Sequence, residues 1–127
     1  MLFKILLWIL GFRINQLSRN SAGFKKAIGN YRVVLQFKTA DGKAQRYYAF
    51  NAGQTSSHKG LHPNPTMAMV FKTPKQALQL IKRMGQAPKD KTVFIYAIRD
   101  GELAIEGDMA YLTFFQSISR FFGPETK

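Results

Sequence analysis

Residues 97–109 of this 127-residue chain read AIRDGELAIEGDM, and they place a turn, a strand and a helix start close together. Asp100-Gly101 is typical of a turn, because glycine adopts backbone conformations that other residues avoid. Leu103 and Ile105 then interrupt the acids of Glu102–Glu106, as the buried side of a short strand would. Gly107-Asp108 predicts the start of a helix that the aspartate caps. The stretch therefore indicates a chain that mixes strands and helices.

The segments on either side of this stretch are predicted to be mainly helical. Met109–Phe122 has the pattern of a helix whose apolar arc is too wide for an ordinary surface helix. Upstream, Thr73-Pro74 predicts a helix start, since threonine can cap the helix and proline at its first position has no amide hydrogen to leave unpaired. Gly85 ends that helix. Lys91–Ile98 is apolar and fits a helix or a strand on periodicity alone.

Further strands are predicted between residues 31 and 72. Tyr31–Lys38 alternates as a half-buried strand, Asp41-Gly42 predicts a hairpin turn, and a second strand follows at Ala44–Ala52. Gly53–Pro65 is rich in Gly, Ser, Pro and Asn and is predicted to be a loop. Thr66–Lys72 returns to a strand pattern that places alternate side chains on one face.

The charge is the most unusual property of the composition. The chain has 19 Lys and Arg against 7 Asp and Glu, a formal net charge of +12, with 46% hydrophobic residues and no Cys. Residues 1–89 hold fifteen of the basic residues and a single acid, Asp41, whereas residues 90–127 are slightly acidic. Such a balance indicates a polyanionic partner, for which nucleic acid and an anionic membrane surface are the ordinary candidates.

The N-terminal residues 1–14 read MLFKILLWILGFRI, an apolar run shorter than the ~20 residues of a spanning helix. Three interpretations stay open: an interfacial helix on anionic lipid, a helix that covers the core of its own domain or of a partner, and a cleaved signal peptide. Ser21–Gly29 is expected to be a small polar hinge. In the interfacial interpretation, the residues at the membrane surface are Lys4, Trp8, Arg13, Arg19, Lys25 and Lys26.

Few residues have the spacing that catalysis or metal binding requires. His58 and His62 lie four apart, but Gly60 and Pro63 argue against the helix that would align them as ligands. The acids between residues 100 and 108 are interpreted as a solvated strand edge and a helix cap. We therefore expect no enzymatic activity, no metal and no cofactor.

Nucleic-acid binding is considered because Tyr47, Tyr48 and Phe50 could stack on bases beside Arg46. The basic residues are, however, spread through every predicted element rather than grouped in one stripe, and no nucleic-acid-binding motif is present. Aromatic residues that pack a core are the favoured interpretation, so nucleic acid is the least favoured partner.

Residues 97–109 also resemble the closing signature of the sterol carrier protein type 2 domain family. The family pattern is an Ala and an apolar residue, two variable positions, Gly-Lys-Leu-x-Ile and x-Gly-Asp before an apolar helix; Glu102 here replaces the basic residue. Ala77–Ile81 followed by Gly85 and Pro88 is similar to the family's short helix and Gly-x-x-Pro link. The resemblance covers residues 31–122 and implies an α+β fold: an antiparallel sheet of about five strands, covered on one side by helices, with an apolar tunnel for a lipid tail.

This resemblance sets the functional expectation. Residues 29–127 are expected to form a lipid-binding domain, preceded by a helical segment at residues 1–28 that could also join two copies. The domain would bind or transfer a sterol, acyl or isoprenoid chain, without catalysis, in the cytoplasm at the inner face of an anionic membrane. The alternatives are a protein–protein accessory module, for example in ubiquinone biosynthesis, and a basic nucleic-acid-binding protein. The residues expected at the tunnel are Met67, Met69, Phe71, Phe94, Met109, Leu112, Phe115 and Ile118.

Overall fold

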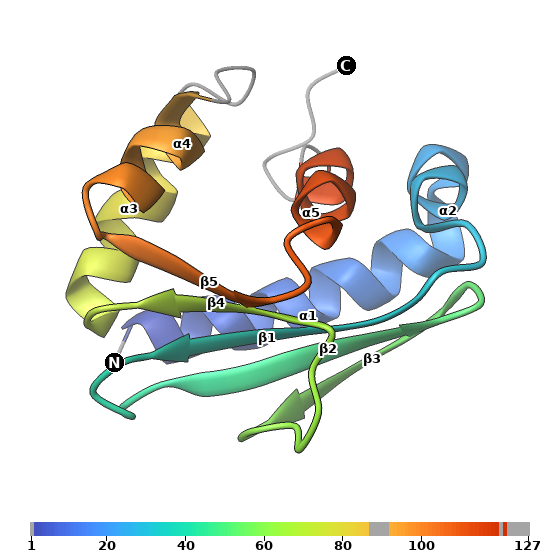
Figure 1. Cartoon of the computed structure of the whole chain (residues 1–127). Coiled ribbons are helices and arrows are strands. Elements are labelled where there is room, and N and C mark those ends of the chain that lie inside the picture. The colour runs from blue at the N-terminus through green and yellow to red at the C-terminus, as the bar shows by residue number, and fades with distance from the viewer. Residues whose placement is uncertain (1, 87–91, 120, 122–127) are drawn as a thin grey trace.

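The computed structural model describes residues 2–86, 92–119 and 121, apart from the side chains of residues 84–86 and 94. A five-stranded sheet forms one layer, and the helices lie on one of its faces (Figure 1). The strands, in the spatial order β3-β2-β1-β4-β5, are β1 (Arg32–Thr39), β2 (Gln45–Asn51), β3 (Gln54–Lys59), β4 (Met67–Phe71) and β5 (Leu103–Gly107). The helices are α1 (Leu2–Asn20), α2 (Ala22–Ile28), α3 (Pro74–Gln86), α4 (Thr92–Arg99) and α5 (Tyr111–Ser119). The predicted α+β architecture with an N-terminal helix is confirmed.

The sheet is mixed, which corrects the expectation of an antiparallel sheet, because β1 and β4 run in the same direction. The strands β1, β2 and β3 are consecutive antiparallel neighbours, so β3 ends near the end of β1. Residues 60–66 then cross the face opposite the helices, and Thr66 pairs with Val34 near the start of β1 through two hydrogen bonds of 3.0 Å. Since the chain returns to that end before β4 begins, β4 runs parallel to β1.

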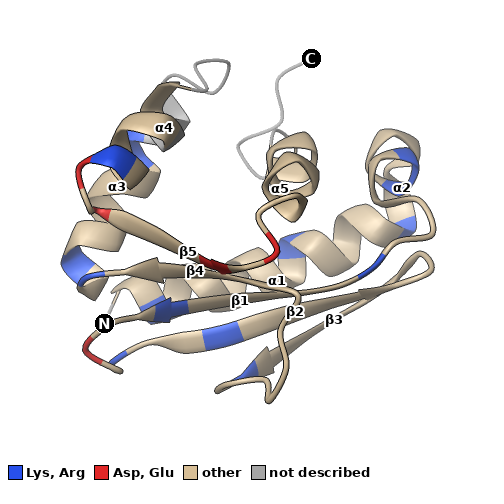
Figure 2. Cartoon of the chain, viewed as in Figure 1, with Lys and Arg blue, Asp and Glu red and all other residues tan. Residues whose placement is uncertain are grey.

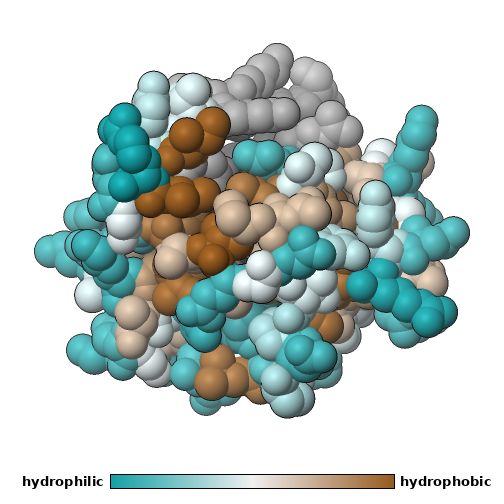
Figure 3. Space-filling view, in the orientation of Figure 1, coloured by the Kyte–Doolittle hydropathy of each residue, from teal (hydrophilic) through white to brown (hydrophobic). Residues whose placement is uncertain are grey.

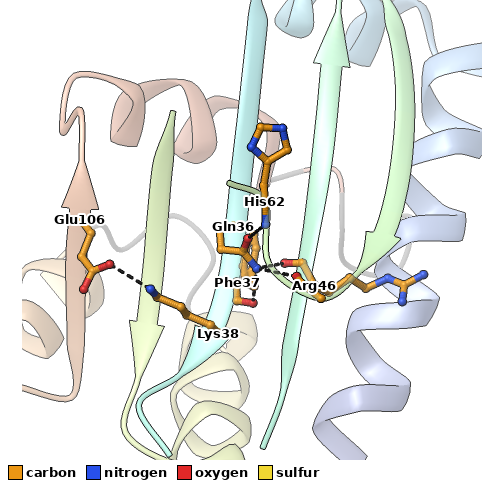
Figure 4. A network of polar contacts seen from close by, with 7 residues as sticks. Gln36, Phe37, Lys38, Arg46, His62 and Glu106 are labelled. Carbon is orange, nitrogen blue, oxygen red and sulfur yellow. Dashed lines mark hydrogen bonds and ion pairs between the residues drawn. The ribbon is translucent and has the colours of Figure 1, made fainter. Parts of the chain in front are cut away.

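The side chain of Gln36 holds this crossing segment against the sheet (Figure 4). Its Nε2 donates to the carbonyl oxygens of Gly60 at 3.0 Å and Arg46 at 3.2 Å, and its Oε1 accepts from the amide of His62 at 2.8 Å. Gln36 is only 1% exposed, and a buried amide is stable only when its hydrogen-bonding groups are paired. Gln36 therefore ties the crossing segment to the centre of the sheet.

The strand β3 corrects the predicted loop over Gly53–Pro65. Its residues pair along β2, with Ser57 opposite Tyr48, although the sequence QTSSHK has no apolar residue. The side that faces α1 is polar: Thr55 Oγ1 donates to Asn15 Oδ1 at 2.6 Å and contacts Ser18 Oγ at 3.0 Å. Backbone pairing and hydroxyl contacts with α1 thus stabilise a strand that hydrophobic alternation does not reveal.

The expected hinge at Ser21–Gly29 is the helix α2. Ser21 Oγ accepts a hydrogen bond from the Phe24 amide at 3.2 Å and caps the helix. Phe24 and Ile28 are buried against the rest of the core, so tertiary packing stabilises a helix of only 7 residues. The ambiguous segment at Lys91–Ile98 is helical from Thr92 onward as α4.

The core lies between the sheet and the helices and is rich in aromatic contacts. Phe37 on β1 lies 5.6 Å from Phe115 on α5, and Phe50 on β2 lies 5.3 Å from Phe114, measured between ring centroids. Edge-to-face and tilted pairs of this kind add to the free energy gained by burial. The helix α5 is thereby fixed over the centre of the sheet.

The helix α1 packs over β2 and β3 as part of the same core. Gly11 makes the approach close: a Cβ at this position would lie 2.4 Å from Ser57 Oγ. Beside it, the hydroxyl of Tyr48 donates to the carbonyl oxygen of Leu7 at 2.5 Å, and burial raises the pKa of the Tyr48 phenol above its usual value. The inner side of α1 is thus held by both close packing and a buried hydrogen bond.

Gly107-Asp108, at the end of the opening stretch, fixes the turn from β5 into α5. Gly107 has a φ of +86°, and a Cβ there would lie 2.6 Å from the carbonyl oxygen of Thr66. Asp108 donates its amide to the same oxygen at 3.0 Å, and its Oδ1 accepts from the Ala110 amide at 3.0 Å. Only glycine fits position 107 without strain, which explains why the Gly-Asp pair marks this turn.

Candidate functional site

The outward side of α1 is apolar and uncovered. We call Leu2, Ile5, Trp8, Ile9 and Phe12 the outer stripe; their exposed fractions run from 50% to 70%. The rings of Trp8 and Phe12 meet edge to face at 4.7 Å. A contiguous apolar surface of this kind is uncommon on a monomeric protein and marks a site of interaction with a membrane or a partner.

The opposite side of the same helix is core. Phe3, Leu7, Ile14 and Leu17 are buried, so the first turns of α1 are apolar on both sides. Of the three interpretations of the N-terminal segment, the structure places α1 over the core of its own domain and leaves the outer stripe free for a second contact. No helix among the described residues is long and apolar enough to cross a membrane.

The basic residues predicted for a membrane surface lie in α1 and α2. Arg13 is half-buried, and Lys4, Arg19, Lys25 and Lys26 are exposed, as is Trp8. None of them takes part in the ion pairs found among the described residues, which join Lys38 to Glu106, Arg83 to Glu102 and Arg99 to Asp100. Their charges are therefore available to an external anion.

The residues predicted for the tunnel fall into two groups. Those on the sheet and the inner side of α5 are buried in the core, namely Met67, Met69, Phe71, Phe115 and Ile118. Leu112 is half-buried and Met109 is 53% exposed, at the edge of that layer. Phe94 belongs to α4, but its side chain lies outside the described residues.

The helix layer covers β5 incompletely. Ile105 is paired with Met69 and faces the helices as Met69 does, yet Ile105 is half-buried whereas Met69 is buried. Figure 3 shows hydrophobic side chains gathered on the face that carries α4, β5 and α5. We call this surface the apolar edge; its residues are Ile95, Ile98, Ile105, Met109 and Leu112.

Two hollows of the described surface lie elsewhere, one near the start of α1 and one near its end. One, of about 270 Å³, is lined by Lys4, Leu7, Gly42, Lys43, Gln45, Arg46, Lys59 and Gly60. The other, of about 360 Å³, is lined by Asn15, Ser18, Arg19, Gly53, Gln54 and Thr55. The first combines four basic side chains, and the second is mainly uncharged and polar.

The other candidate groups have structural surroundings. Tyr47 stacks on His58 at 4.9 Å and meets His62 edge to face at 5.0 Å, and no group of His, Cys, Asp or Glu that could hold a metal is found in the part of the chain the structure describes. Tyr48 and Phe50 face the helices and are buried. Since Tyr47 lies on the opposite face, the three aromatic residues do not form one stacking platform.

Comparison with known sequences gives one partial match. No protein-family model matches the chain. Structural maintenance of chromosomes protein 5 of Caenorhabditis elegans is 38% identical over 77 residues, which are 61% of this chain but 7% of that protein. The chain spans only a small fraction of this relative's length, so the match does not assign the relative's activity to this chain.

Solved structures show the fold. The UbiJ-SCP2 Ubiquinone synthesis protein matches with a TM-score of 0.65 and 16% identity over 95% of both chains. Sterol Carrier Protein 2 from Yarrowia lipolytica, in its apo form, matches with a TM-score of 0.58 and 15% identity over 95% of this chain and 91% of that one. A sec-alkylsulfatase, Pisa1 from Pseudomonas sp., matches over 80% of this chain but 14% of its own, with a TM-score of 0.55 and 14% identity.

Sequence reasoning did not identify the basic hollow. Its Lys43, Arg46 and Lys59 are far from Lys4 along the chain, and Arg46 and Lys59 meet only because β2 pairs with β3. The signal was present as basic residues on two neighbouring strands. It could not be interpreted while residues 54–59 were assigned to a loop.

The two sides of α1 predict different responses to truncation. Leu7→Ala, at a residue 2% exposed, should lower the free energy of unfolding by about 2–5 kcal/mol, because it leaves a cavity in the core. Ile5→Ala, at a residue 51% exposed, should change it by less than about 0.5 kcal/mol. Urea unfolding of both variants measures the difference, and equal losses would contradict the two-sided packing of α1.

Proposed function

Since the chain has the sterol carrier protein 2 fold that its sequence indicated, we propose that it binds a lipid while α1 rests on an anionic membrane. The apolar chain of a sterol, acyl or isoprenoid lipid would enter at the apolar edge. The protein would act without catalysis, at the inner face of the membrane, as a carrier or as a protein that presents the lipid to others.

The observation that carries the membrane part is the outer stripe on a helix whose inner side is fixed. The helix that carries its five side chains is held in place by the core contacts of Leu7 and Gly11. Moving apolar area from water into lipid is favourable by about 25 cal/mol per Å². Because α1 is already ordered, binding would cost little conformational entropy.

The surrounding charges support an anionic surface. Lys4 and Arg13 flank the outer stripe on α1, and Arg19, Lys25 and Lys26 continue the positive charge toward α2. Each basic residue near an anionic leaflet contributes about 1 kcal/mol. The acids of the described residues instead gather around β5 and the turns at its ends, with Asp41 as the exception (Figure 2).

The apolar edge supports the lipid-binding part. Ile105 and Leu112 are half-buried and Met109 is exposed, where complete cover would bury them. Behind them lie Met69 and Phe115, which are among the residues expected to line the tunnel for the lipid. Methionine side chains adapt to irregular apolar ligands, so Met109 would suit the entrance and Met69 the interior.

A second function is favoured by one comparison. The UbiJ-SCP2 structure carries the name of a ubiquinone synthesis protein, and an accessory module that presents an isoprenoid chain to other proteins would need the same apolar edge. In that case the outer stripe would bind a partner helix or a second copy. Vesicle binding separates this alternative from the first.

The membrane proposal predicts that the outer stripe decides vesicle affinity. Wild-type protein should bind vesicles that contain phosphatidylglycerol, and binding should weaken as salt screens the headgroups. Ile5→Ser should weaken binding about tenfold, because burial of such a side chain contributes about 1.5–3 kcal/mol. Leu61→Ser is the matched control, since Leu61 is 54% exposed and lies on the crossing segment. Equal affinities for the two variants in sedimentation assays would contradict membrane binding through the outer stripe of α1.

The lipid-binding proposal predicts that the apolar edge controls uptake of a fluorescent fatty acid. Met109→Asp should reduce probe affinity, since a carboxylate at an apolar entrance is costly to desolvate. The exposure of Met109 should leave the melting temperature nearly unchanged. Leu61→Asp adds the same charge away from the apolar edge and should bind the probe as the wild type does. An unaffected Met109→Asp variant would place the lipid elsewhere.

A further inference from the structure

The hollow of about 270 Å³ beside α1 has a positive lining. Its basic residues come from separate places in the chain: Lys4 from α1, Lys43 from the turn after β1, Arg46 from β2 and Lys59 from the end of β3. Figure 2 shows basic residues gathered where β2, the end of β3 and the β1–β2 turn meet. The fold thus brings together four basic residues that are spread through residues 4–59 of the sequence.

These cations have little neutralisation within the described part of the chain. None of the ion pairs found there involves them. Asp41, in the neighbouring turn, compensates Lys43 in part: hydrogen bonds from Thr39 Oγ1 at 2.6 Å and from the Lys43 amide at 3.1 Å, together with the nearby charge of Lys43, lower the pKa of this carboxyl. Arg46 and Lys59 lie directly opposite each other, a pairing of like charges that costs stability unless an anion compensates it.

The geometry of Arg46 suits an oxyanion. Its Nε donates to Ser57 Oγ at 2.7 Å, which orients the guanidinium. A guanidinium fork matches two oxygens of one phosphate, and lysines add point charges around it. The volume corresponds to a single headgroup rather than to a length of polymer.

We propose that this hollow binds the phosphate group of an anionic lipid headgroup. The proposal rests on the proposed binding of α1 to a membrane and adds to it a specific contact between the hollow and a headgroup phosphate. Lys4 lies one helical turn from Trp8 of the outer stripe, so the hollow is beside the side chains that enter the lipid. A phosphate at the level of the headgroups would then meet Arg46 and Lys43 while the outer stripe meets the acyl chains.

The test uses phosphate and vesicles on one set of variants. The double variant Lys43→Gln/Arg46→Gln removes two charges from the hollow. Lys75→Gln/Lys82→Gln removes two exposed charges from α3 and is the charge-matched control. Inorganic phosphate is titrated while the amide resonances of Gly42 and Gly60, which line the hollow, are followed by NMR. Binding to phosphatidylcholine vesicles with and without phosphatidylglycerol is measured in parallel.

The expected result is that phosphate shifts both glycine amides in the wild type and the control, and not in the hollow variant. Affinity for phosphatidylglycerol vesicles should fall about tenfold in the hollow variant relative to the control, since charge-assisted hydrogen bonds to phosphate oxygens are lost. If both double variants lose vesicle binding equally, the phosphate site in the hollow is overturned, whereas membrane binding through the outer stripe of α1 still stands.

Two further outcomes identify another ligand. If wild-type protein ignores every vesicle while phosphate still shifts the glycine amides, the lipid headgroup and the proposed membrane binding are both overturned. The site would then serve a soluble phosphorylated compound. If a single-stranded oligonucleotide competes with phosphate at the hollow and binds more tightly than vesicles, the lipid assignment is overturned in favour of nucleic acid.

Discussion

The close contact of α1 with β2 and β3 is the constraint on which the rest of the molecule depends. Gly11 lets the helix approach Ser57, and the hydroxyl of Tyr48 holds the carbonyl of Leu7. A larger residue at position 11 would force the helix away from the strands, and the polar side of β3 would lose its partners on α1. Because these contacts fix the inner side of α1, the helix cannot rotate to bury the outer stripe within the domain.

This constraint links the fold to the proposed function. The helix α1 is apolar on both sides but buries only one of them within its own domain, so the outer stripe is a surface for an external contact. The same contact brings Lys4 to the ends of β2 and β3, where Arg46 and Lys59 lie. Apolar and positive surfaces therefore become adjacent for one structural reason. At the other edge of the sheet, the incomplete cover of Ile105 leaves a separate apolar surface, which is the proposed entrance for a lipid chain.

Sequence patterns predicted the elements whose burial is periodic and failed where polar contacts decide. The alternation in β1 and β4, the Asp41-Gly42 hairpin and the cap at Thr73-Pro74 were evident from local physics. The strand β3 was not, since its QTSSHK sequence pairs through backbone and hydroxyl groups. The parallel β1–β4 pair depends on the crossing held by Gln36, which no local pattern encodes. For the site, period two placed Met67, Met69 and Phe71 on one face, but only strand pairing brings Arg46 to Lys59.

In the proposed function, α1 packs against the core with one side and against the membrane with the other, and Trp8 reports on the membrane side directly because it is the only tryptophan of the chain. The measurement is quenching of Trp8 fluorescence by phosphatidylcholine brominated at different acyl positions, in vesicles that also contain phosphatidylglycerol. We expect the strongest quenching by bromines nearest the headgroups, with the blue-shifted emission of an interfacial indole and an unchanged melting curve. If the emission of vesicle-bound protein stays that of a water-exposed indole and is insensitive to bromine at every depth, α1 does not bind the membrane through its outer stripe.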